Sequence, residues 1–162
     1  MIGTIEEFRR AWRDESAITS RVLGALTDAS LGQRVSANDR SLGDMAWHLV
    51  TTITEMAGLT GLTVPGPAPD AATPSTAAPI TAAYDAAAAG LVEQVSGQWT
   101  DDTLAVEDEM YGQKWPRGAT LSAIIVHQIH HRGAMTVLMR QAGLTVPSIY
   151  GPNREETEAM RH

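Results

Sequence analysis

Residues 120–142 read TLSAIIVHQIHHRGAMTVLMRQA and contain three of the five histidines of the chain. Their apolar residues recur every three or four positions and no proline interrupts them, which predicts one long helix. At about 100° per residue, His131 lies on the same face as the apolar Ile124. His127 lies at one flank of this face, and His130 lies on its shoulder, about 100° from His131. The helix therefore turns His131 towards the interior of the protein.

Three further segments, 4–29, 41–60 and 80–99, show the same helical spacing of apolar side chains. Thr4 followed three positions later by Glu7 is a capping signal that opens the first segment. Ser41 and Asp44 open the second segment in the same way. Gly143, directly after residues 120–142, is a candidate left-handed cap.

The connections between these segments are polar and rich in turn-forming residues. Pro65–Pro79 holds five of the eight prolines and is expected to be a loop, and Asp101–Ala119 is a second long connection. Within it, the acidic run Glu107–Glu109 is expected to be a solvated loop. No segment alternates as a strand does, so the sequence predicts an all-α, up-down four-helix bundle in which any sheet is marginal. Residues 1–162 then form a single domain with a C-terminal tail at 144–162.

Composition excludes several classes of function. The chain has no cysteine, so it lacks disulfides, thiolate metal sites and a cysteine nucleophile. Twelve basic against nineteen acidic residues give a net charge of -7, and no basic stripe is present, which argues against nucleic acid as a partner. We find neither a membrane-spanning stretch nor a signal peptide. A cytoplasmic protein with a small-molecule substrate is the resulting expectation.

The histidines form a candidate metal site. His127 and His131 are one helical turn apart, with Cβ atoms about 5–6 Å from each other, so both imidazoles can reach one metal ion. The pair His127 and His130 competes with this one, but its midpoint faces the core less well. His48, in the segment 41–60, can reach the same point from a neighbouring helix. The terminal His162 is uninformative.

Three imidazoles with one open position form the catalytic type of site, and zinc or nickel fits imidazole ligands best among the common metals. The alternative interpretation is that these histidines are hydrogen-bonded core residues without a metal.

Two carboxylates are candidates for catalytic roles. Asp44 lies one turn before His48 and is either a partner that orients it or a helix cap. Glu55 lies two turns after His48 and is either a general base or part of a solvated helix face.

Other residues have two interpretations as well. Arg132 pairs with a carboxylate of another helix or with an anionic substrate, and Gly133 is expected to allow close helix packing. Tyr111 and Trp115 are expected either to line a pocket mouth or to attach their loop to the bundle. The same two interpretations apply to Tyr150 in the tail.

Three stretches together resemble the DinB-like four-helix superfamily. They are the run His127-Gln-Ile-His-His-Arg-Gly133, the segment Met45-Ala-Trp-His48-Leu and the tail Gly143-Leu-Thr-Val-Pro-Ser-Ile-Tyr-Gly-Pro152. The resemblance extends over most of the chain. It implies a metal-binding bundle with one histidine from the second helix and two from the last, which correspond to His48, His127 and His131. One departure is Ala134, where the family often has glutamine.

The same resemblance implies a function. The superfamily includes transferases and isomerases that use thiols such as bacillithiol, mycothiol or glutathione, and a metal-bound thiol loses its proton readily. The expectation is therefore a metal-dependent thiol transferase, with the thiol supplied from outside this cysteine-free chain. A metal-dependent hydrolase with a metal-bound water and a non-catalytic metal-binding or stress protein are the alternatives.

Residues 120–142 are apolar on nearly every side. Ile125, Ile129 and Thr136 lie roughly opposite the histidine face, so this side also needs a cover. A second subunit or the C-terminal tail can supply it, and we expect a homodimer. The pocket at the histidines is expected beneath the connections Pro65–Pro79 and Asp101–Ala119.

Overall fold

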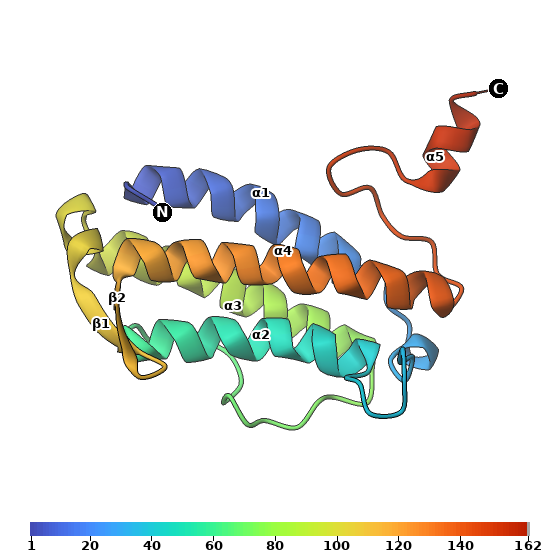
Figure 1. Ribbon diagram of the computed structural model, residues 1–162, viewed down its shortest axis with the longest axis horizontal. Helices are drawn as coiled ribbons and strands as arrows, with labels where there is room; N and C mark the ends of the chain where they lie inside the picture. The colour runs from blue at the N-terminus through green and yellow to red at the C-terminus, as the bar shows by residue number, and fades with distance from the viewer. Residues whose placement is uncertain (162) are drawn as a thin grey trace.

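The computed structural model describes residues 1–161, so His162 lies outside the described residues. The chain is mostly helical, and four long helices lie side by side, with a short fifth helix standing apart near the C-terminus (Figure 1). They are α1 (Ile5–Gly24), α2 (Leu42–Leu59), α3 (Ala77–Gln98), α4 (Arg117–Gln141) and α5 (Arg154–Ala159). Two strands, β1 (Glu107–Met110) and β2 (Gln113–Pro116), form a small antiparallel sheet between α3 and α4.

The core lies between the four long helices. Both α1 and α2 pack against both α3 and α4, so each long helix buries a face against two others. Fully buried side chains from each helix fill this space, among them Phe8, Leu49, Ile80 and Leu121. The expectation of a predominantly helical fold is confirmed, and the exact up-down order of the bundle stays a prediction. Among the described residues, no helix is both long and apolar enough to cross a membrane.

The helix boundaries agree with the sequence at three of the four segments to within three residues. The predicted extent of the first helix, to residue 29, is wrong because α1 ends at Gly24. Thr27 is extended, and its backbone N–H is bonded to the Ser30 hydroxyl, so a separate turn of 3₁₀-helix begins there. At the other end, Gly143 has a φ of 78°, the left-handed cap expected after the last long helix.

The connection between α3 and α4 is a hairpin where a loop was expected. Met110 pairs with Gln113, which leaves a two-residue turn at Tyr111 and Gly112. The prediction that Glu107–Glu109 is a solvated loop is therefore wrong, since these residues belong to β1. Asp108 is bound there by Arg117, with 2.9 Å between Oδ2 and Nε, and this ion pair ties the hairpin to the start of α4.

The proline-rich connection before α3 lies along α2. The Trp47 indole donates to the Ala71 carbonyl at 2.8 Å, and the Thr54 hydroxyl donates to the Pro67 carbonyl at 2.9 Å. Its last proline, Pro79, lies in the first turn of α3, where a missing N–H costs no helical hydrogen bond. This connection is therefore attached to the bundle at several points.

Gly133 does not serve helix packing within the chain. A Cβ built at this position meets no atom within 4 Å, so the expectation of close packing at Gly133 is wrong. The close approach lies at Gly118 instead, where a Cβ would come within 2.4 Å of the Ile2 carbonyl oxygen.

Replacing Gly118 by alanine is expected to lower the free energy of unfolding by about 1–3 kcal/mol, because the N-terminal backbone must move to admit the methyl group. The matched control is Gly97→Ala in α3, where a Cβ meets nothing within 4 Å. That variant should gain about 0.5 kcal/mol from helix propensity. Urea unfolding of both proteins measures the difference, and equal midpoints would show that the contact at Gly118 is soft.

Candidate metal centre

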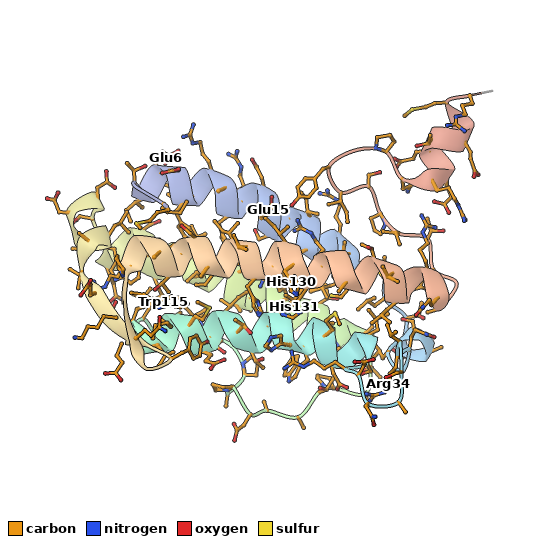
Figure 2. The ribbon with its side chains drawn as sticks, in the orientation of Figure 1. Glu6, Glu15, Arg34, Trp115, His130 and His131 are labelled. Carbon is orange, nitrogen blue, oxygen red and sulfur yellow. The ribbon has the colours of Figure 1, made fainter. Side chains whose placement is uncertain are left out.

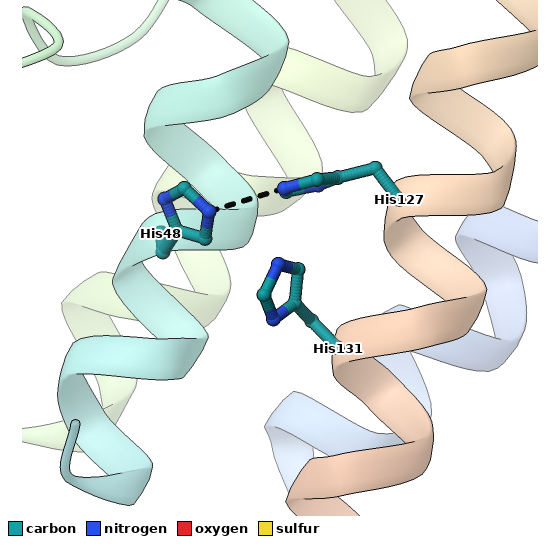
Figure 3. A group of neighbouring side chains, drawn as sticks. All are labelled: His48, His127 and His131. Atoms are coloured by element: carbon teal, nitrogen blue, oxygen red, sulfur yellow. Dashed lines mark hydrogen bonds between the residues drawn. The ribbon is translucent and has the colours of Figure 1, made fainter. Parts of the chain in front are cut away.

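His48 of α2 and His127 and His131 of α4 converge in the space between the two helices (Figure 3). Each offers one ring nitrogen, and these atoms lie within 4.8 Å of one another. The Nε2 atoms of His48 and His127 are 3.1 Å apart. The structure thus brings together the three histidines that the sequence singled out, and metal binding by them stays a prediction.

Helix geometry explains which histidines meet. His127 and His131 project from one face of α4 at a spacing of one turn, and α2 packs against that face. His130 is exposed and stays outside the cluster, although its ring centroid is 4.9 Å from that of His131. His48 is oriented by Thr52, whose hydroxyl lies 3.4 Å from Nδ1.

The cluster keeps its histidines neutral at pH 7. Burial lowers the pKa of both His48 and His127 to about 4, and the positive charges of neighbouring groups, Arg40 among them, add to the effect. The pKa of His131 is also lowered, first by burial and then by His130 and Arg40. Neutral imidazoles offer free lone pairs, which is the form that a metal ion requires.

The nitrogen positions fit a metal ion. Two nitrogens that bond one zinc ion at about 2.0–2.1 Å cannot be more than about 4.2 Å apart, and the Nε2 atoms of His48 and His127 meet this limit. In the described part of the chain, the Nδ1 atom of His127 is buried without a hydrogen-bond partner. The residues present therefore fit a divalent transition metal on donor type and protonation state, and the pair His48 and His127 also fits on spacing.

The metal-free protein is expected to lose stability as the pH falls from about 6.5 to 4. In this range the unfolded chain protonates its histidines near their ordinary pKa of 6.5, whereas His48 and His127 stay neutral in the folded protein. The unfolded state then binds more protons, so acid favours unfolding. Urea midpoints at pH 7 and pH 5 measure the loss. A His48→Gln, His127→Gln double variant should lose less, and an equal loss would contradict the assignment.

A cavity of about 400 Å³ is lined by two of the three clustered histidines, His48 and His127. Its walls come from α2, α4 and the hairpin, and include His48, Thr52, Glu55, Tyr111, Trp115 and His127. The expectation of a pocket beneath Asp101–Ala119 therefore agrees with the structure. Residues 65–79 supply none of the described lining residues, so that part of the expectation is wrong because this connection lies along α2 instead.

Glu55 and Tyr111 are neighbours in the lining of this cavity. Burial raises the pKa of Tyr111, and the charge of Glu55 and a hydrogen bond to its carboxylate raise it further. Tyr111 and Trp115 pack edge to face, with ring centroids 6.2 Å apart. Trp115 lies on the hairpin at one end of the bundle, whereas His131 lies nearer the middle (Figure 2). Of the two interpretations of Tyr111 and Trp115, the structure supports the pocket mouth.

Asp44 acts as a helix cap in the structure. Its carboxylate accepts hydrogen bonds from the Ser41 hydroxyl at 2.7 Å and from the Thr73 hydroxyl at 3.0 Å, and Arg34 lies 3.3 Å away. The bond from Ser41 is the main reason why the pKa of Asp44 is lowered. These partners occupy the carboxylate, which supports capping over the orientation of His48.

Arg132 forms an ion pair with α1, away from the histidines. Its side chain is only 1% exposed and bonds the Glu15 carboxylate and the Thr19 hydroxyl. The Tyr150 hydroxyl from the tail joins this pair and donates to Glu15 at 2.9 Å. Sequence reasoning missed Glu15 as a partner, although its position within the apolar stripe of the first helix was a signal for a buried ion pair.

Comparisons with known proteins agree over the whole chain. A family model described as the DinB family matches residues 1–161. The uncharacterised protein YrdA of Bacillus subtilis (strain 168) is 44% identical over 156 residues, which is 96% of this chain and 93% of that protein. A crystal structure of a DinB-like protein from Bacillus cereus ATCC 10987 matches with a TM-score of 0.89 and 41% identity over 93% of this chain and 100% of that chain. The DinB-like protein YjoA of Bacillus subtilis, at 19% identity, shares the fold with a TM-score of 0.69 over 88% of this chain and 96% of that chain.

Proposed function

The chain belongs to the DinB family. We propose that it is a metal-dependent transferase that uses a low-molecular-weight thiol of the mycothiol or bacillithiol type. The family assignment confirms the resemblance seen in the histidine run and the tail. The observation that carries the proposal is the cluster of His48, His127 and His131, of which His48 and His127 line a cavity large enough for a small molecule.

In this proposal, the histidines bind the metal and a carboxylate accepts a proton. His48, His127 and His131 would hold a divalent metal, with zinc or nickel favoured by imidazole ligands. When bound, the metal supplies Lewis acidity that lowers the pKa of a coordinated thiol or water. Glu55, on the cavity wall, is our candidate for the group that accepts the released proton at its carboxylate.

The composition and the cavity are compatible with an external thiol. The chain has no cysteine, so a thiol nucleophile must come from solution. Tyr111 and Trp115 line the cavity on the side of the hairpin and would contact a bound thiol there. Our proposal places this reaction in the cytoplasm, where thiols are kept reduced.

A thermal-shift experiment tests the proposal. Zinc-loaded and metal-free protein are heated with a mycothiol or bacillithiol analogue, and with its S-methyl derivative as the control. Binding to the folded state raises the Tm, so only the zinc-loaded protein with the free thiol should respond. A zinc-loaded protein that ignores the thiol would contradict the transferase. Activity on ester or amide substrates would then favour the hydrolase, and inactivity a metal-binding or stress protein.

We also propose a homodimer through the outer face of α4. Ile125, expected on that face, is buried in the core, whereas Val126 and Val137 are 62% and 55% exposed and Ile129 is 37% exposed. The open space at Gly133 allows a second helix to approach closely. Light scattering at micromolar concentration should give twice the mass of one chain, and a monomeric mass would reject the dimer.

A further inference from the structure

The cavity beside the histidines has an acidic wall. Glu55 is half-buried, and among the described lining residues no lysine or arginine accompanies it. Arg40 precedes α2 and is not among the described lining residues, whereas Glu55 lies near the other end of that helix. In the metal-free protein, the Glu55 carboxylate therefore attracts a cation into the cavity.

Two aromatic rings line the cavity next to this carboxylate. Tyr111 and Trp115 are packed edge to face at an interplanar angle of 69°, and both rings line the cavity that Glu55 lines. Aromatic faces attract cations through their quadrupole, and two rings with a carboxylate are a typical receptor for an ammonium group.

Tyr111 adopts a backbone conformation that its residue type disfavours. Its φ is 53°, and among the described residues other than glycine it is the one with a positive φ. In a two-residue hairpin turn this first position is usually asparagine, aspartate or glycine, and a bulky side chain there costs about 1–2 kcal/mol. Strained residues of this kind gather at binding sites. The disfavoured backbone conformation therefore occurs at a residue whose side chain lines the cavity.

We propose that Glu55, Tyr111 and Trp115 form a cation subsite, which binds an ammonium or quaternary ammonium group of the substrate beside the three histidines. This inference deepens the proposed function, and it rests on that function for the reaction that the bound substrate undergoes. The substrate would then be a molecule that carries a positively charged nitrogen close to its reacting atom, so that both fit into the same cavity.

Choline and its uncharged isostere 3,3-dimethylbutan-1-ol test the subsite without any thiol. Each is titrated into metal-free and zinc-loaded protein, and the indole N–H signal of Trp115 is followed by NMR, assigned with the Trp115→Phe variant. We expect choline to bind about tenfold more tightly than the isostere in the metal-free protein, in line with carboxylate and cation–π attraction. The zinc-loaded protein should show a smaller preference for choline, because the charge of the metal ion opposes a second cation.

Two variants and one control locate the effect. Glu55→Gln should remove the preference for choline, whereas Glu93→Gln on the exposed face of α3 makes the same change of charge and should leave it intact. Tyr111→Asn should weaken choline binding severalfold and raise the Tm, because asparagine tolerates a positive φ. A gain in Tm with loss of binding is a result that a merely structural Tyr111 would not give.

The outcomes separate this inference from the proposed function. Equal binding of choline and the isostere, absence of a Trp115 shift, or an unchanged preference in Glu55→Gln would each overturn the cation subsite. Choline binding in a protein whose zinc-loaded form ignores thiols would support the subsite and reject the thiol transferase.

Discussion

Replacing His131 by alanine is expected to abolish stoichiometric metal binding, whereas replacing His130 should leave it largely intact. His131 offers one of the three converging ring nitrogens, while His130 is exposed and lies outside the cluster. Loss of even an outer partner of a ligand typically costs about 10–100-fold in metal affinity, so loss of a ligand should cost more than about 100-fold. Elemental analysis after dialysis against a small excess of zinc measures the difference.

The two variants are matched controls for each other. They are neighbours in α4, lose the same imidazole and should keep the same helical circular dichroism, since alanine favours helix. If His130→Ala loses the metal and His131→Ala retains it, the ligand set is wrong. If wild-type protein takes up no metal at all, the transferase loses its mechanism, and a helical binding protein becomes the better account.

Replacing Glu15 by alanine is expected to destabilise the protein by about 3–5 kcal/mol. The change leaves the guanidinium of Arg132, only 1% exposed, without its carboxylate. An unpaired buried charge is costly because it has lost its water and gained no partner. Urea unfolding at pH 7 measures the loss, and a loss below about 1 kcal/mol would mean that water reaches Arg132.

Two further variants separate the charge from the packing. Tyr150→Phe keeps the ring and removes one hydrogen bond, so it should cost only about 1 kcal/mol. The double variant Glu15→Ala, Arg132→Met removes the buried charge and should recover much of the stability lost in Glu15→Ala.

The four long helices could be predicted from the sequence because their hydrogen bonds and side-chain directions are local. Each backbone N–H bonds a carbonyl four residues away, so apolar spacing and capping residues such as Ser41 are sufficient to locate a helix. The same local geometry placed His127 and His131 on the inward face of α4 and His130 beside it. Local geometry alone does not place His48 beside them, because its position depends on which helix packs against α4.

The hairpin and the pairing of distant side chains were decided only by the tertiary structure. The strand Glu107–Met110 is mostly acidic, and Tyr111–Gly112 lacks the usual asparagine of a tight turn, so neither has a local strand signal. Glu15 and Arg132 are 117 positions apart, and nothing in the sequence near either residue specifies the other. Glu55 likewise has two local interpretations, and it faces a cavity only because the hairpin closes over α2. Such contacts form when helices bury their apolar faces against one another, and the free energy of that burial depends on the whole chain.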